Sequence, residues 1–190
     1  NWRVATIPLG VGGRAYGGVA ITQKLVDAFA MDTEHGGRYP ITGYQADGSP
    51  VIDPQSGYDE SGFTSFTHPI LGSTKSTYNM YLNREPRFYA CIGFDRGTFE
   101  IDGTTITLKL RGGELHGSTL KETDEYQSCT GYVCQKWISR TSYYDKSLNT
   151  YTYTRYAYPY LRLAELYLSY AEADFEYNGS LSGKSLEYIN

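Results

Sequence analysis

The longest regular pattern in the chain runs from Tyr158 to Tyr177 and reads YPYLRLAELYLSYAEADFEY. Its polar positions recur every three or four residues and form one narrow stripe: Arg162, Glu165, Ser169, Glu172 and Glu176. Nearly all other positions are apolar or aromatic, which predicts a helix that is covered on most sides. Pro159 suits the first turn of such a helix, and Asn178-Gly179 can adopt the left-handed conformation that ends one.

A second amphipathic helix is predicted after Gly179, where the sequence SLSGKSLEYIN places Leu186 and Ile189 three residues apart. The two helices together have the length of one tetratricopeptide-type helical hairpin, with its second helix cut short. We therefore expect two regions. Residues 1–157 would form a loop-rich region with short helices and a β-hairpin, and residues 158–190 would begin a helical hairpin of the same domain.

A short helix is predicted near the N-terminal end of the chain. Thr22 can cap it, and Ile21 can pack against Val26 one turn into the helix. We expect this helix to end near Met31. Its apolar face is predicted to consist of Leu25, Val26 and Phe29.

No periodicity is sustained from Asp32 to Thr77, where Gly, Pro, Ser, Asp and Tyr dominate. A loop of this length in a compact domain is usually functional or disordered, and the many tyrosines argue against disorder. A cluster of oxygen-bearing side chains within it lacks the full calcium-loop pattern, so we expect a solvated turn, with a calcium site as the alternative. The cluster comprises Asp53, Gln55, Gly57, Asp59 and Glu60.

The stretch Thr77–Arg87 is predicted to be a short helix that Pro86 breaks, and Phe88–Phe94 is a candidate strand. Arg84 and Arg87 flank the turn that this proline fixes. Their guanidinium groups can donate to carboxylates or to exposed carbonyls, or they can contact a ligand.

Short strands are predicted further along the chain. Thr98–Ile101 and Thr104–Leu110 flank Asp102-Gly103, a strong signal for a two-residue hairpin turn. Thr130–Ile138 alternates in a way that suits another short strand. Residues 139–154 read as a tyrosine-rich connection.

Four stretches of the chain resemble motifs of the SusD/RagB family of surface nutrient-binding lipoproteins. They are YPYLRLAELYLSYAEA, RAYGGVAITQKLVDAFAM, NREPRFYA and TGYVCQK. In the motif NREPRFYA, Glu85 occupies a position where the family more often has an aspartate. The resemblance implies a mainly α fold with tetratricopeptide-like helical hairpins, long loops and small β-hairpins. Counted over the elements of this chain alone, the expected class is α+β.

The same resemblance implies a lipid-anchored protein on the outer-membrane surface of a Bacteroidetes bacterium. Such a protein would capture oligosaccharides, or peptides in some members, and deliver them to a SusC-like TonB-dependent transporter. The family's first helices, signal peptide and lipidated cysteine have no counterpart in this sequence. We therefore expect the chain to be a piece of a longer polypeptide, whose remainder covers the apolar helix at residues 158–177.

Composition narrows the function classes. The formal net charge is −4 and no basic run interleaves with aromatic residues, so nucleic acid is not expected as a partner. No apolar run approaches membrane-spanning length. Cys91, Cys129 and Cys134 lack the spacing of a zinc site, and we expect all three to be small packed side chains.

The chemistry on offer suits binding rather than catalysis. His35, His68 and His116 are isolated, and no catalytic motif surrounds them, so neither an enzyme nor a cofactor is expected. The chain has 20 tyrosines, whose flat faces and hydroxyl groups suit sugars. A peptide-binding protein, a fragment of a glycan hydrolase and a structural scaffold are the alternatives. The predicted ligand contacts are Tyr16, Tyr44, Tyr58, Tyr78 and Arg84.

Overall fold

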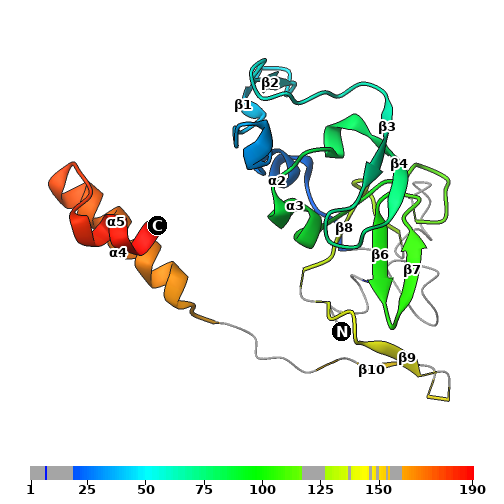
Figure 1. Cartoon of the computed structure of the whole chain (residues 1–190). Helices are drawn as coiled ribbons and strands as arrows, with labels where there is room; N and C mark the ends of the chain where they lie inside the picture. Colours follow the sequence, from blue (N-terminus) through cyan, green and yellow to red (C-terminus); the bar gives the residue numbers. More distant parts are fainter. Residues whose placement is uncertain are drawn as a thin grey trace. The chain divides into compact units, whose positions relative to one another are not determined.

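The computed structural model of the chain forms two compact units, Asn1–Thr154 and Arg155–Asn190 (Figure 1). The structure describes residues 7, 19–116, 127–136, 138–145, 147–148, 150–152, 154 and 160–190. The predicted N-terminal loop that carries Tyr16 lies outside these residues.

Five two-stranded antiparallel sheets make up the β structure of the described residues. Four are hairpins of chain neighbours: β1 (Ile41–Tyr44) with β2 (Pro50–Ile52), β3 (Phe63–Thr67) with β4 (Thr74–Tyr78), β6 (Thr98–Ile101) with β7 (Thr104–Thr107), and β9 (Tyr143–Asp145) with β10 (Thr150–Thr152). The fifth pairs two distant segments, β5 (Ile92–Phe94) and β8 (Tyr132–Cys134).

Among the described residues of the first unit, the helices are short: α2 (Gln23–Asp27), α3 (Pro86–Cys91) and the 3-10 turns η1 (Thr33–His35) and η2 (Asn79–Tyr81). The second unit holds α4 (Leu163–Asn178) and α5 (Gly183–Ile189). The described residues are therefore mixed α and β, as expected from the count of elements in this chain, and the sheets are the expected small β-hairpins with one further strand pair.

The stretch from Asp32 to Thr77 contains two hairpins, β1–β2 and β3–β4, where the sequence predicted a long loop. The sequence did not predict these strands because most of their side chains are exposed to solvent. All but one of the five residues of β3 are exposed, so neither face carries an apolar row and the sequence shows no alternation. Backbone hydrogen bonds and cross-strand contacts hold these strands instead of burial.

The predicted helix at Thr77–Arg87 is also wrong. Here β4 ends, η2 makes one tight turn, and Asn83 adopts a left-handed backbone with φ 52°. Pro86 opens α3 instead of breaking a helix, because a proline at the first helical position leaves no hydrogen bond unmade. The candidate strand Phe88–Phe94 is accordingly half helix, and only its last three residues form β5.

Helix α2 is capped as predicted, with the Thr22 hydroxyl accepting from the Leu25 N–H at 3.4 Å. It ends at Asp27 and not near Met31. Val26 is fully buried, but Leu25 is 50% exposed and does not belong to the apolar face.

Helix α2 ends early because the side chain of Arg84, which is distant in sequence, binds carbonyls at the end of the helix. The side chain of Arg84 is buried, and its Nη2 donates to the carbonyls of Val26 at 2.8 Å and Phe29 at 2.7 Å. A further bond reaches the carbonyl of Met80 at 3.2 Å. These carbonyls lie at the C-terminal end of α2 and in η2, where a cation is favoured by the unpaired acceptors.

Aromatic rings enclose the same guanidinium. Its carbon lies 5.4 Å from the ring centre of Tyr58 and 5.2 Å from that of Phe88. The neighbouring Glu85 accepts from the Ala30 N–H at 3.2 Å and so holds the chain after α2 from the other side. Through the buried Arg84 and the half-buried Glu85, the NREPRF motif thus connects α2, η2 and α3.

The turn at Asp102-Gly103 is confirmed, with φ values of 53° and 65°. These are the left-handed angles that a two-residue hairpin turn requires. The hairpin strand β7 stops three residues before Leu110, so its predicted extent is too long.

The described residues of the first unit form two hydrophobic clusters. The first contains Ile7, Phe99, Ile101, Leu108, Leu110 and Val133. The second contains Ile21, Val26, Tyr81, Phe88, Tyr89, Ile92, Phe94 and Tyr132. All three cysteines are free, and Cys91 and Cys134 are half-buried against the second cluster. Cys129 is exposed, so its expected packing is wrong.

The second unit is the predicted pair of helices. α4 ends at Gly179, whose φ of 67° is the predicted left-handed stop. The Asp174 carboxylate accepts from the Ser182 N–H at 2.7 Å and from the Ser185 hydroxyl, and so joins α4 to the start of α5. Apolar side chains of α4 are exposed, among them Leu163, Leu166, Leu168 and Phe175. That other parts of a longer polypeptide cover them stays a prediction.

His68 packs inside the second cluster, 4% exposed, with its ring stacked 6.4 Å from Phe94 and edge-on to Tyr89 at 5.4 Å. Its Nδ1 accepts from the N–H groups of Ile70 and Leu71, both at 3.2 Å. Burial lowers the pKa of His68 to about 4.

We predict that His68 makes the protein less stable in mild acid. Its folded pKa lies below the usual value, so its contribution is complete above about pH 6.5 and falls away towards pH 4, by roughly 2 to 3 kcal/mol. His68→Asn keeps an acceptor near the Nδ1 position but does not titrate in this range. Urea unfolding at several pH values should show a flatter decline for the variant, and equal declines would contradict the prediction.

We also predict that Arg84→Met lowers the free energy of unfolding by about 3 kcal/mol, because buried carbonyls lose their donors. Arg87→Met is the matched control from the same motif. Its side chain is 74% exposed and pairs with Glu85, and the expected loss is below about 1 kcal/mol. Chemical unfolding of both variants would test this, and equal losses would contradict it.

Candidate functional site

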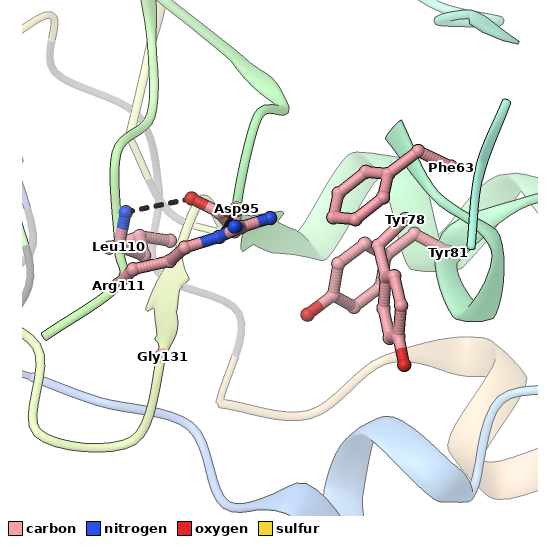
Figure 2. A pocket seen from close by; sticks show the side chains of 7 residues that line it. All are labelled: Phe63, Tyr78, Tyr81, Asp95, Leu110, Arg111 and Gly131. Carbon is pink, nitrogen blue, oxygen red and sulfur yellow. Dashed lines mark hydrogen bonds and ion pairs between the residues drawn. The ribbon is translucent and has the colours of Figure 1, made fainter. Parts of the chain in front are cut away.

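A pocket of about 410 Å³ opens in the first unit (Figure 2). One side comes from β3, β4 and η2, and the other from the segments that follow β5 and β7 and precede β8. Its lining residues are Phe63, Tyr78, Tyr81, Asp95, Leu110, Arg111 and Gly131.

Three aromatic rings form one wall of the pocket. Phe63 and Tyr78 are direct partners in the β3–β4 register, and their ring centres lie 5.2 Å apart. Tyr81 continues the wall from η2, 6.2 Å from Tyr78. Phe63 is 49% exposed whereas Tyr81 is buried, so Phe63 supplies the open aromatic surface and Tyr81 its support. The Tyr78 hydroxyl is held by the carbonyl of Glu60.

An ion pair forms the opposite, polar wall. One Asp95 oxygen accepts from the Leu110 N–H at 3.0 Å, and the other accepts from Arg111 Nε at 2.9 Å. The guanidinium carbon of Arg111 lies 5.0 Å from the ring centre of Phe63. Figure 2 shows the three rings grouped on one side, with Asp95, Leu110 and Arg111 on the other. A planar charged group therefore stands next to an open aromatic ring.

A second ion pair supports the polar wall from outside the lining. Arg96 donates to a Glu114 oxygen at 2.7 Å, and its Nε lies 3.8 Å from Asp95 Oδ2. The hydrogen bond lowers the pKa of Glu114 and raises that of Arg96. Arg96 sits in a left-handed conformation with φ 62°, which costs energy for a residue other than glycine. Such strain is often found beside binding sites.

The sequence identified one lining residue, Tyr78, and missed Phe63, Asp95 and Arg111. Asp95 and Arg111 belong to different hairpin-flanking segments, and no local pattern relates them. The pairing of Phe63 with Tyr78 could have been found only by recognising the exposed β3–β4 hairpin. Tyr16 lies outside the described residues.

The other predicted contacts within the described residues do not line this pocket. Tyr44 is exposed, and its hydroxyl donates to Asp27 at 2.8 Å, which raises the pKa of Tyr44. Tyr58 is half-buried over Arg84 and donates to Glu60 at 2.9 Å. Arg84 is 2% exposed, and the geometry matches the alternative in which it binds carbonyls. Ligand contact by these residues stays a prediction.

The oxygen-rich segment proposed as an alternative calcium site forms tight turns. The carboxylates of Asp53 and Asp59 accept from the N–H groups of Gln55 and Ser61, at 2.9 and 2.8 Å. Within the described ranges, no three His, Cys, Asp or Glu side chains come together in a way that could hold a metal ion.

We predict that Asp95→Ala lowers the free energy of unfolding by about 2 kcal/mol, because the Leu110 N–H loses its acceptor. Asp47→Ala is a suitable control, since Asp47 binds Ser49 in an exposed turn; the loss there should stay below about 1 kcal/mol. Urea unfolding of both variants gives the comparison. Losses of the same size would show that the Asp95 bonds do not stabilise the pocket.

Comparison with known proteins gives a family and a fold. The sequence model of the SusD family matches residues 3–190, which confirms the family resemblance. Two solved structures of BT4246, a Bacteroides SusD-like protein, are similar over 98% of this chain. The selenomethionine form has a TM-score of 0.70 at 25% identity, and the other form has 0.69 at 24%.

The chain spans 31% and 30% of the length of those two structures. The search of curated proteins gave no match. Among the helices of the described residues, none combines the length and the apolarity needed to cross a membrane.

Proposed function

Because this chain belongs to the SusD family, we propose that it is part of a cell-surface lipoprotein that captures oligosaccharides. The capture site is the pocket between Phe63 and Arg111, and the bound glycan is passed to a SusC-like TonB-dependent transporter. The single observation that carries this proposal is the open Phe63 ring beside the Asp95–Arg111 pair.

This pairing of surfaces matches the chemistry of sugars. A pyranose has an apolar face that stacks on an aromatic ring and hydroxyl groups around its edge that need charged or polar partners. Phe63 offers the ring, and Arg111, which Asp95 holds in place, offers hydrogen-bond donors within reach of it. Capture is noncovalent. The pocket lining contains one carboxylate, Asp95, whereas glycoside hydrolysis ordinarily uses two.

The remaining parts of the proposal follow from the family. The lipid anchor and the outer-membrane location belong to the longer polypeptide, and α4 with α5 would form a tetratricopeptide-like hairpin that packs against its other helices. The exposed apolar side chains of α4 support such packing. A peptide-binding role is the alternative, and it would use the same pocket.

We predict that Phe63→Ala weakens oligosaccharide binding about tenfold, because the sugar loses its stacking surface. Tyr39→Ala is the control: Tyr39 is 56% exposed, comparable to Phe63, and does not line the pocket. A glycan and peptide array identifies a ligand, and calorimetry on the variants measures the change. Equal effects of the two substitutions would reject this pocket, release of new reducing ends would indicate a hydrolase, and binding of peptides alone would favour the peptide role.

A further inference from the structure

We infer that the pocket selects an acidic sugar, with the carboxylate of a uronic acid unit bound by the terminal nitrogens of Arg111. This inference rests on the proposed function and specifies the class of glycan. Some polar groups of the pocket are already engaged in hydrogen bonds within the protein, and others still have hydrogen-bonding capacity.

The acceptors of the polar wall are largely engaged. Both oxygens of Asp95 accept hydrogen bonds, from Leu110 and from Arg111, and its side chain is 12% exposed. The Tyr78 hydroxyl already donates to the carbonyl of Glu60, and Tyr81 is buried. A ligand that needs strong acceptors from the protein would find few here.

The hydrogen-bond donors of the polar wall, in contrast, still have capacity for a ligand. Arg111 uses Nε for Asp95, and within the described part of the chain its terminal nitrogens make no hydrogen bond. Its side chain is 52% exposed. Asp95 on one edge and the Phe63 ring at 5.0 Å fix the position of the guanidinium before any ligand arrives. The open end of a guanidinium presents two parallel N–H donors, which match the two oxygens of a carboxylate.

The charges around the pocket are balanced overall. Glu114 pairs with Arg96 at 2.7 Å, and Asp95 pairs with Arg111 at 2.9 Å and lies 3.8 Å from Arg96. A carboxylate at the outer edge of Arg111 would therefore be bound by the charged N–H donors of a guanidinium that is 52% exposed, and not by an excess of positive charge. A neutral hydroxyl would gain about half as much from the same donors.

The Phe63 ring makes a sugar the fitting carrier of this carboxylate. The ring is 49% exposed and adjoins the open end of Arg111. A uronic acid places its carboxylate at the edge of a ring whose face is apolar, so stacking and ion pairing can occur together.

The test compares trigalacturonic acid with maltotriose, a neutral trisaccharide of equal length, by calorimetry at low salt. We expect the acidic sugar to bind about tenfold more tightly, because hydrogen bonds to charged groups are the stronger ones. Arg111→Gln should abolish this preference, and Arg111→Lys, which keeps the charge without the paired donors, should retain part of it. The preference should shrink at high salt.

Arg38→Gln is the matched control. Arg38 is 51% exposed and pairs with Asp53 at 3.3 Å, much as Arg111 pairs with Asp95, but it does not line the pocket. The preference should survive this substitution. Thermal melts of all variants establish that each is folded.

Maltotriose binding as tight as the acid, or a preference that persists in Arg111→Gln, would overturn the inference while leaving the proposed glycan-binding function intact. Binding of neither trisaccharide, nor of any glycan on an array, would overturn the proposed function itself. Binding of an acidic peptide in place of both sugars would overturn the assignment to a sugar and identify a peptide carboxylate as the ligand.

Discussion

The first unit depends on one buried cation. The guanidinium of Arg84 donates to main-chain carbonyls of Val26, Phe29 and Met80. Removing a charge from water is costly unless its donors are satisfied. Here three carbonyls and two aromatic faces replace most of the lost water, and Nε is left without a hydrogen-bond partner among the described residues. Desolvation lowers the pKa of Arg84, but an arginine starts so high that it stays charged. Lysine could not fork to the same acceptors.

This interaction connects the interior to the pocket. Met80, whose carbonyl Arg84 binds, lies in η2 directly before Tyr81. Tyr81 packs against Phe88 and Phe94 in the second cluster while its other side supports the aromatic wall. Asp95 follows Phe94, so the aromatic and the polar wall are anchored to the same cluster. The open Phe63 ring is then held against Arg111 by strands that are themselves mostly exposed.

The pocket combines rigid support with unused binding capacity. Its acceptors are engaged by the protein, whereas the terminal donors of Arg111 and half of the Phe63 surface stay open. An arrangement fixed before the ligand arrives loses little entropy on binding. Membership of the SusD family supports the proposed capture role, and the proposed glycan class rests on the donors of Arg111 rather than on the family.

The sequence by itself determined the features that depend on neighbouring residues. The turn at Asp102-Gly103, the end of α4 at Gly179, the cap at Thr22 and the family motifs all express local backbone preference or direct similarity. Only the tertiary structure decided that Arg84 of NREPRF is a buried connector and that Phe63, Asp95 and Arg111 share one pocket. Backbone preferences act over a few residues, so the sequence can reveal turns and caps. An ion pair between two segments depends instead on which distant strands come together. Exposed strands carry no apolar period, so the sequence does not reveal where they lie.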